Sequence, residues 1–158
     1  MKKLIPLAIS ALLLSGCGQA APESTEPEYK FGIDDTFIYK ELDGDYVFIV
    51  AYVYQNNSNK PQPFQLACKD SVFKSGIECQ PTFDEYNFYS AYVDTAQIND
   101  EIMSGNAVKV YAGYTLKDFN PQAKYDFTVR LSDRSKTDDV FIEKTVNSAD
   151  IEIREEKE

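Results

Sequence analysis

The sequence contains no histidine and no tryptophan, and only three of its 158 residues are cysteine. The absence of histidine removes the commonest general base and the commonest metal ligand. It excludes Ser-His-Asp and Cys-His catalysis and every zinc site that uses histidine. Basic residues are also few: the chain has 16 Lys and Arg and 26 Asp and Glu, which gives a net charge of −10. A chain of this charge is poorly suited to neutralising phosphates, so we expect no nucleic-acid partner.

The clearest feature that is present is an N-terminal targeting signal. Lys2 and Lys3 precede an apolar run over residues 4–14, which has the length of a signal-peptide core and is too short to span a membrane. The sequence Leu-Ser-Gly-Cys at residues 14–17 resembles the bacterial lipobox. This resemblance implies that residues 1–16 are a cleaved lipoprotein signal peptide and that Cys17 becomes the acylated N-terminus. Two or three acyl chains anchor a protein stably, because each buried CH₂ contributes roughly 0.8 kcal/mol.

The predicted address is therefore extracytoplasmic, with a lipid anchor as the link to a bacterial membrane. In a Gram-positive cell the anchor would lie in the outer face of the cell membrane, and in a Gram-negative cell it would lie in the outer membrane. Both alternatives stay open. Residues 18–28 contain two prolines, three glutamates and no large apolar side chain. Such a segment buries too little surface to offset chain entropy. We expect residues 17–28 to be the acylated cysteine and a disordered linker.

Residues 29–158 carry the pattern of an all-β domain. Apolar and polar residues alternate over 108–116 and 125–131, which is typical of half-buried strands. The unbroken apolar run at 46–54 is rich in β-branched and aromatic residues and indicates a central strand. A hairpin over 72–78 has Gly76 where a positive φ is needed. We also expect strands near 31–37, 64–68, 140–146 and 151–153, no helical stretch of any length, and an irregular segment at 82–102.

Seven or eight short strands predict an Ig-like antiparallel β-sandwich. Five segments in this region follow a recognisable order: 44–50, 52–58, 73–78, 104–110 and 114–118. Together they resemble the small Ig-like lipoproteins of the domain-of-unknown-function families 5067 and 4352, over about residues 45–132. The chain has Ser104 where those families usually have proline, and no family motif over 82–102. The resemblance implies an extracytoplasmic module behind a lipobox and carries over no catalytic residue.

Two cysteines remain in the predicted domain, Cys68 and Cys79. In an oxidising compartment a pair of cysteines often forms a disulfide. A two-residue turn at 75–76 sets a hairpin register that does not align the two, so a bond requires a bulge or a break in the strand. A disulfide and two free thiols are both left open.

Aromatic residues are the most suggestive feature for binding, with 11 Tyr and 10 Phe in the chain. Tyrosine is favoured on contact surfaces because it is amphipathic and loses little entropy when it is fixed. Phe83, Tyr86, Tyr89 and Tyr92 cluster in one segment and are our candidate contact surface. Strand parity adds Tyr52, Tyr54 and Tyr111 as a solvent-facing stripe. The alternative is that these rings pair across strands or close one end of the sandwich.

These observations favour a non-enzymatic, lipid-anchored binding module whose partner is an envelope protein, a peptide or a glycan. A second hypothesis is an accessory subunit of a cell-envelope complex, without its own ligand and bound through a sheet edge. A calcium-binding sensor is a weaker alternative, in which the acidic clusters at 34–35, 43–45 and 138–139 converge. We expect no cofactor and assign no catalytic or metal-binding residue.

Overall fold

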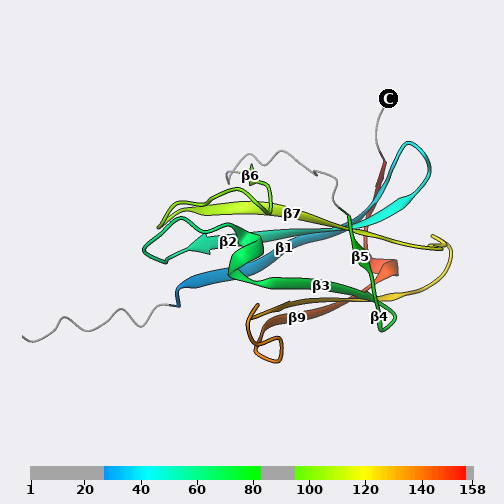
Figure 1. Cartoon of the computed structure of the whole chain (residues 1–158). Helices are drawn as coiled ribbons and strands as arrows, with labels where there is room; N and C mark the ends of the chain where they lie inside the picture. The colour runs from blue at the N-terminus through cyan, green and yellow to red at the C-terminus, as the bar shows by residue number, and fades with distance from the viewer. Residues whose placement is uncertain (1–26, 83–94, 156–158) are drawn as a thin grey trace, which may run out of the picture.

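The structure, a computed structural model, describes residues 27–82 and 95–155, which form two facing β-sheets (Figure 1). One sheet has the strand order β10-β1-β2-β7-β5, with β6 also paired to β7, and the other has the order β4-β3-β8-β9. The elements in chain order are β1 (Tyr29–Lys40), β2 (Tyr46–Asn56), α1 (Phe64–Ala67), β3 (Lys69–Lys74), β4 (Ile77–Glu78), β5 (Gln80–Pro81), β6 (Thr95–Ala96), β7 (Ala107–Thr115), β8 (Asp126–Ser132), β9 (Val140–Asn147), the 3₁₀ turn η1 (Ser148–Asp150) and β10 (Ile153–Glu155).

The predicted all-β sandwich is confirmed. The expected strands at 46–54, 108–116, 125–131 and 140–146 are β2, β7, β8 and β9. Pairing is mostly antiparallel, and the exceptions among the described strands are the short parallel pairs β1–β10 and β6–β7. No helix within the described ranges is long and apolar enough to cross a bilayer.

The hairpin expected at 72–78 is also confirmed. β3 pairs with β4 so that Phe73 faces Glu78 and Lys74 faces Ile77. The turn residues Ser75 and Gly76 have φ angles of 49° and 83°. Positive φ at both positions is the type I′ geometry, whose twist matches that of the flanking strands.

The main core lies between the two sheets and is rich in aromatic rings. Phe48 of β2 stacks on Phe127 of β8 with the ring centroids 4.5 Å apart, and Tyr52 stacks on Phe64 of α1 at 5.0 Å. These four side chains are fully buried. Ring pairs at such distances add about 0.5–1.5 kcal/mol each beyond the burial of their area.

β2 is apolar on both faces, which explains the unbroken run in its sequence. Its outward residues Val47 and Ile49 join Phe37 of β1 in a second buried cluster on the other face of the sheet. The guanidinium of Arg154 from β10 lies 3.8 Å from the centre of the Phe37 ring and is paired with Asp35 at 2.9 Å. A strand buried on both sides has no need of polar alternation.

Two predictions about this region were wrong. Residues 64–67 form the four-residue helix α1 and not a strand. Pro63 precedes it in an extended conformation, and the burial of Phe64 and Ala67 with exposure of Leu66 follows helical spacing. Tyr52 and Tyr54 are fully buried and do not form a solvent-facing stripe, because they share the inward face with Val108 and Val110 of β7.

Candidate binding groove

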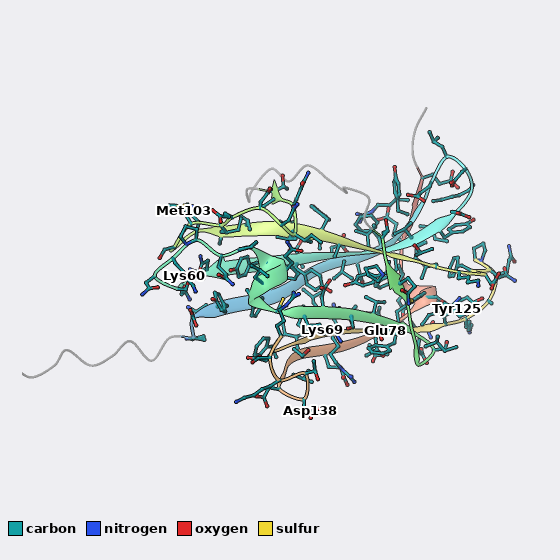
Figure 2. The ribbon with its side chains drawn as sticks, viewed as in Figure 1. Lys60, Lys69, Glu78, Met103, Tyr125 and Asp138 are labelled. Carbon is teal, nitrogen blue, oxygen red and sulfur yellow. The ribbon has the colours of Figure 1, made fainter. Side chains whose placement is uncertain are left out.

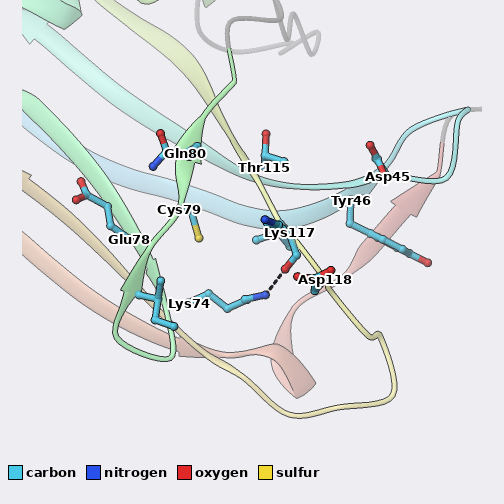
Figure 3. A pocket seen from close by; sticks show the side chains of 11 residues that line it. Asp45, Tyr46, Lys74, Glu78, Cys79, Gln80, Thr115, Lys117 and Asp118 are labelled. Atoms are coloured by element: carbon cyan, nitrogen blue, oxygen red, sulfur yellow. Dashed lines mark hydrogen bonds between the residues drawn. The ribbon is translucent and has the colours of Figure 1, made fainter.

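A groove of about 640 Å³ lies at one end of the sandwich, where the chain crosses from β4 to β5 (Figure 3). We call it the end groove. Three separate parts of the sequence form it: the start of β2, the β3–β4 hairpin with β5, and the end of β7 with the loop that follows. Its lining residues are Asp45, Tyr46, Lys74, Ile77, Glu78, Cys79, Gln80, Thr115, Leu116, Lys117 and Asp118.

Backbone and side-chain contacts hold these parts in place. The Leu116 N–H donates to the carbonyl of Tyr46 at 2.9 Å and joins the two strand ends. Lys74 Nζ donates to the carbonyl of Lys117 at 2.5 Å, as the dashed line in Figure 3 shows, and lies 5.2 Å from the centre of the Tyr125 ring. The Lys74 side chain therefore bridges the hairpin and the loop after β7.

The end groove combines apolar surface with charges of both signs. The apolar part includes Ile77, which is 73% exposed, and Leu116, which is buried. The charged part comprises two lysines, Lys74 and Lys117, and three acidic residues. This mixture fits a peptide segment, which offers apolar side chains and charged groups together. Burial raises the pKa of the Cys79 thiol, despite the opposing effect of nearby Lys74, and this disfavours the thiolate form, which is the nucleophile.

The opposite end of the sandwich is closed by a side-chain clamp. The amide nitrogen of Asn56 donates to the carbonyls of Lys60 and Ile102, and its Oδ1 accepts from the N–H and the hydroxyl of Ser58. Gly105, at a φ of 83°, donates its N–H to the Asn56 carbonyl. Figure 2 shows Lys60 and Met103 at this end and Glu78 and Tyr125 at the other.

A small polar cluster lies inside the core. The Tyr114 hydroxyl donates to a carboxylate oxygen of Asp70, and the fully buried Tyr52 hydroxyl has no hydrogen-bond partner within residues 27–82 and 95–155. Burial raises the pKa of Asp70 and, more strongly, those of the two phenols. These groups face the interior and contribute nothing to the lining of the end groove.

The sequence-predicted site residues fall into two groups, those outside the described residues and the two cysteines within them. Cys17 and the candidate contact residues Phe83, Tyr86, Tyr89 and Tyr92 lie outside the described residues. Cys68 and Cys79 are buried free thiols, so no disulfide is formed. The Cys79 N–H bonds to the carbonyl of Val72, four residues beyond Cys68. Four strand residues span roughly 13 Å, which a disulfide does not bridge.

The acidic pair at 34–35 is used within the fold. Asp34 pairs with Lys109 at 2.7 Å, and Asp35 pairs with Arg154. The hydrogen bond that Lys109 donates to the Asp34 carboxylate raises the pKa of Lys109. Among residues 27–82 and 95–155, no three His, Cys, Asp or Glu side chains come close enough together to hold a metal ion.

One family comparison bears on the chain. The family described as "Domain of unknown function (DUF5067)" matches residues 19–129. The chain belongs to the DUF5067 family. No curated protein and no solved structure matches it.

The DUF5067 match contains the whole lining of the end groove, because the last lining residue is Asp118. Three of the five segments that carried the sequence resemblance, 44–50, 73–78 and 114–118, supply lining residues. The other two, 52–58 and 104–110, meet at the Asn56 clamp. The match ends within β8, so β9 and β10 lie outside the matched part of the DUF5067 domain.

Proposed function

We propose that this protein is a non-enzymatic, lipid-anchored binding module of the bacterial cell envelope, and that it holds a peptide segment of an envelope protein in the end groove. The N-terminal signal and Cys17 provide the anchor, and residues 18–28 provide the tether. The family match supports a DUF5067-type domain and names no ligand.

The position of the groove relative to the start of β1, which follows the tether in the sequence, is the observation that carries the proposal. β1 begins at Tyr29, which pairs with Asn56, and ends at Lys40, which pairs with Tyr46 beside the groove. β1 thus starts at one end of the sandwich and ends at the other, as Figure 1 shows, and the residues that line the groove lie at the second end. The two ends of β1 are separated by roughly 35 Å at the usual rise per residue. If the start of β1 faces the membrane, the groove lies at the far end of the domain, where a partner outside the membrane reaches it first.

The anchor is tested by replacing Cys17 with Ala. Without the thiol no acyl chain is attached, so we expect the protein to leave the membrane fraction and to lose incorporation of a labelled fatty acid. A Cys68→Ala variant is the matched control and keeps both properties. Retention of the label in Cys17→Ala refutes acylation at this position.

The groove is tested by site-specific photo-crosslinking in intact cells. A photoreactive residue replaces Ile77 at the groove or, as a control, Leu66 on α1; these side chains are 73% and 52% exposed. We expect a discrete crosslinked product from position 77 and none from position 66. Equal products from both positions, or none from position 77, refute binding in the end groove. A glycan partner is recognised by a product whose added mass glycosidases remove.

A specific observation also favours the accessory-subunit hypothesis as a second candidate. β9 is an edge strand: it pairs with β8 on one side, and no described strand pairs with it on the other.

A further inference from the structure

β9 forms the open edge of the second sheet. It pairs with β8 on one side, and no described strand pairs with it on the other. Five of its eight residues are exposed, including the apolar Val140 and Phe141. An exposed edge strand presents unpaired backbone groups that an added strand can use.

The register shows which backbone groups point outward. The Ser148 N–H donates to the Tyr125 carbonyl just beyond the end of the β8–β9 ladder. Bonded and non-bonded positions alternate along an antiparallel pair. Ile142, Lys144 and Val146 therefore bond to β8, whereas Glu143 and Thr145 direct their backbone N–H and C=O groups toward the open side.

A second groove, of about 540 Å³, begins at this edge and extends toward β1. We call it the side groove. Phe31 of β1 and Phe141 and Ile142 of β9 help to line it. The register shifts between Leu131 and Ser132, so Phe141 is the extra residue of a bulge. Its ring stacks on Phe31 with the centroids 5.3 Å apart. An added strand would find apolar surface beside Ile142.

Lys144 gives the edge a charge preference. It pairs with buried Val129, so its side chain lies on the inward face of β9, and it is exposed at the edge. It makes no ion pair with a described residue, whereas its neighbour Glu143 is held by Arg130 at 2.6 Å. A carboxylate on an added strand would satisfy Lys144. A second copy of β9, added antiparallel and centred, would instead place a second Lys144 there, and like charges directly opposite are destabilising.

We propose that β9 binds an extended segment of a partner protein by strand addition, and that the segment carries a carboxylate facing Lys144 with apolar residues two positions away on each side. The flanking apolar residues lie against Ile142 and Val146, and backbone hydrogen bonds form with Glu143 and Thr145. This site is separate from the end groove, so it does not depend on peptide binding there, and it deepens the accessory-subunit hypothesis.

The test uses the mature, acylated full chain in mild detergent and the peptide Thr-Val-Thr-Glu-Thr-Val-Thr as the probe. The order of its residues is the same in both directions, so the peptide does not presuppose parallel or antiparallel addition to β9. Thr145→Pro removes the outward N–H of residue 145 and leaves the hydrogen bonds between β9 and β8 in place. Thr145→Val keeps that N–H. Both variants lose the Thr145 hydroxyl contact with Thr128, so they are matched.

We expect wild type and Thr145→Val to bind equally and Thr145→Pro to bind at least about tenfold more weakly. Lys144→Glu weakens binding by about tenfold, and a peptide with Lys in place of Glu restores it on this variant. Equal binding by Thr145→Pro and Thr145→Val, no rescue by the charge swap, or no binding to the wild type overturns the proposal. Dimerisation of the wild type that Thr145→Pro abolishes overturns it in favour of a second copy.

Discussion

Replacement of Asn56 tests whether one buried side chain closes the end of the sandwich opposite the end groove. The Asn56 side chain is fully buried and makes four hydrogen bonds. It donates to the carbonyls of Lys60 at 2.8 Å and Ile102 at 2.7 Å, and it accepts from the N–H of Ser58 at 3.0 Å and the hydroxyl of Ser58 at 2.6 Å. It thereby ties the loop after β2 to the segment before β7.

The size of the effect follows from these bonds. A typical hydrogen bond contributes about 0.5–1.5 kcal/mol net, and a buried group left unsatisfied costs more. Asn56→Ala removes four such bonds and leaves two carbonyls without that partner. We expect it to lower the free energy of unfolding by about 3–4 kcal/mol, after allowance for partial relaxation. Ser58→Ala removes the hydroxyl bonds alone and costs about 1 kcal/mol.

Urea unfolding followed by circular dichroism measures these differences on the chain that lacks residues 1–17. Asn57→Ala is the matched control, because within the described residues its half-buried side chain makes one solvent-exposed bond, to the Pro27 carbonyl at 3.2 Å. We expect this control to lie within about 0.5 kcal/mol of wild type. A loss below about 1 kcal/mol for Asn56→Ala, or an equal loss for Asn57→Ala, refutes the clamp.

Three further predictions concern titration, the hairpin and the thiols. Burial raises the pKa of Asp70 above its ordinary 3.8, so its contribution to stability is full below that pH and is lost as pH rises. The melting temperature of Asp70→Asn, relative to wild type, should therefore increase from pH 3.5 to 7 in a thermal scan; a constant difference contradicts this. Gly76→Ala should destabilise the fold by about 1 kcal/mol in urea, because a φ of 83° is strained for alanine although the space is open; no loss contradicts the turn geometry. Cys68 and Cys79 should react with a thiol reagent only on unfolding and without prior reduction, and a need for reductant contradicts free thiols.

Much of the fold could be predicted because strand periodicity is a local property. The alternation that indicated β7 and β8 reflects one buried and one open face. The turn at Ser75 and Gly76 was predictable for the same reason, since its geometry depends on adjacent residues alone. The strand expected at 64–68 was wrong, because a short apolar run that follows a proline fits a helix as well as a strand.

The candidate site could be predicted far less well. Parity alone assigned Tyr52 to a solvent-facing stripe, and β2 is buried on both faces, so parity along it does not tell inside from outside. The end groove depends on the pairing of β2 with β7, which places Tyr46 beside Leu116 from seventy residues later in the chain. The motif segments gave the signal that these parts belong together, but their spacing says nothing of the contact between Lys74 and Lys117.

The most direct test of the account is partner capture by a groove variant in native membranes. Lys117→Glu changes the charge of the groove, and the exposed Lys60 at the opposite end provides the matched control Lys60→Glu with the same change of net charge. Each full-length protein is cross-linked in cells and purified in mild detergent, and its partners are quantified by mass spectrometry. The account predicts a partner that wild type and Lys60→Glu capture equally and that Lys117→Glu loses. Equal capture by all three proteins contradicts binding in the end groove.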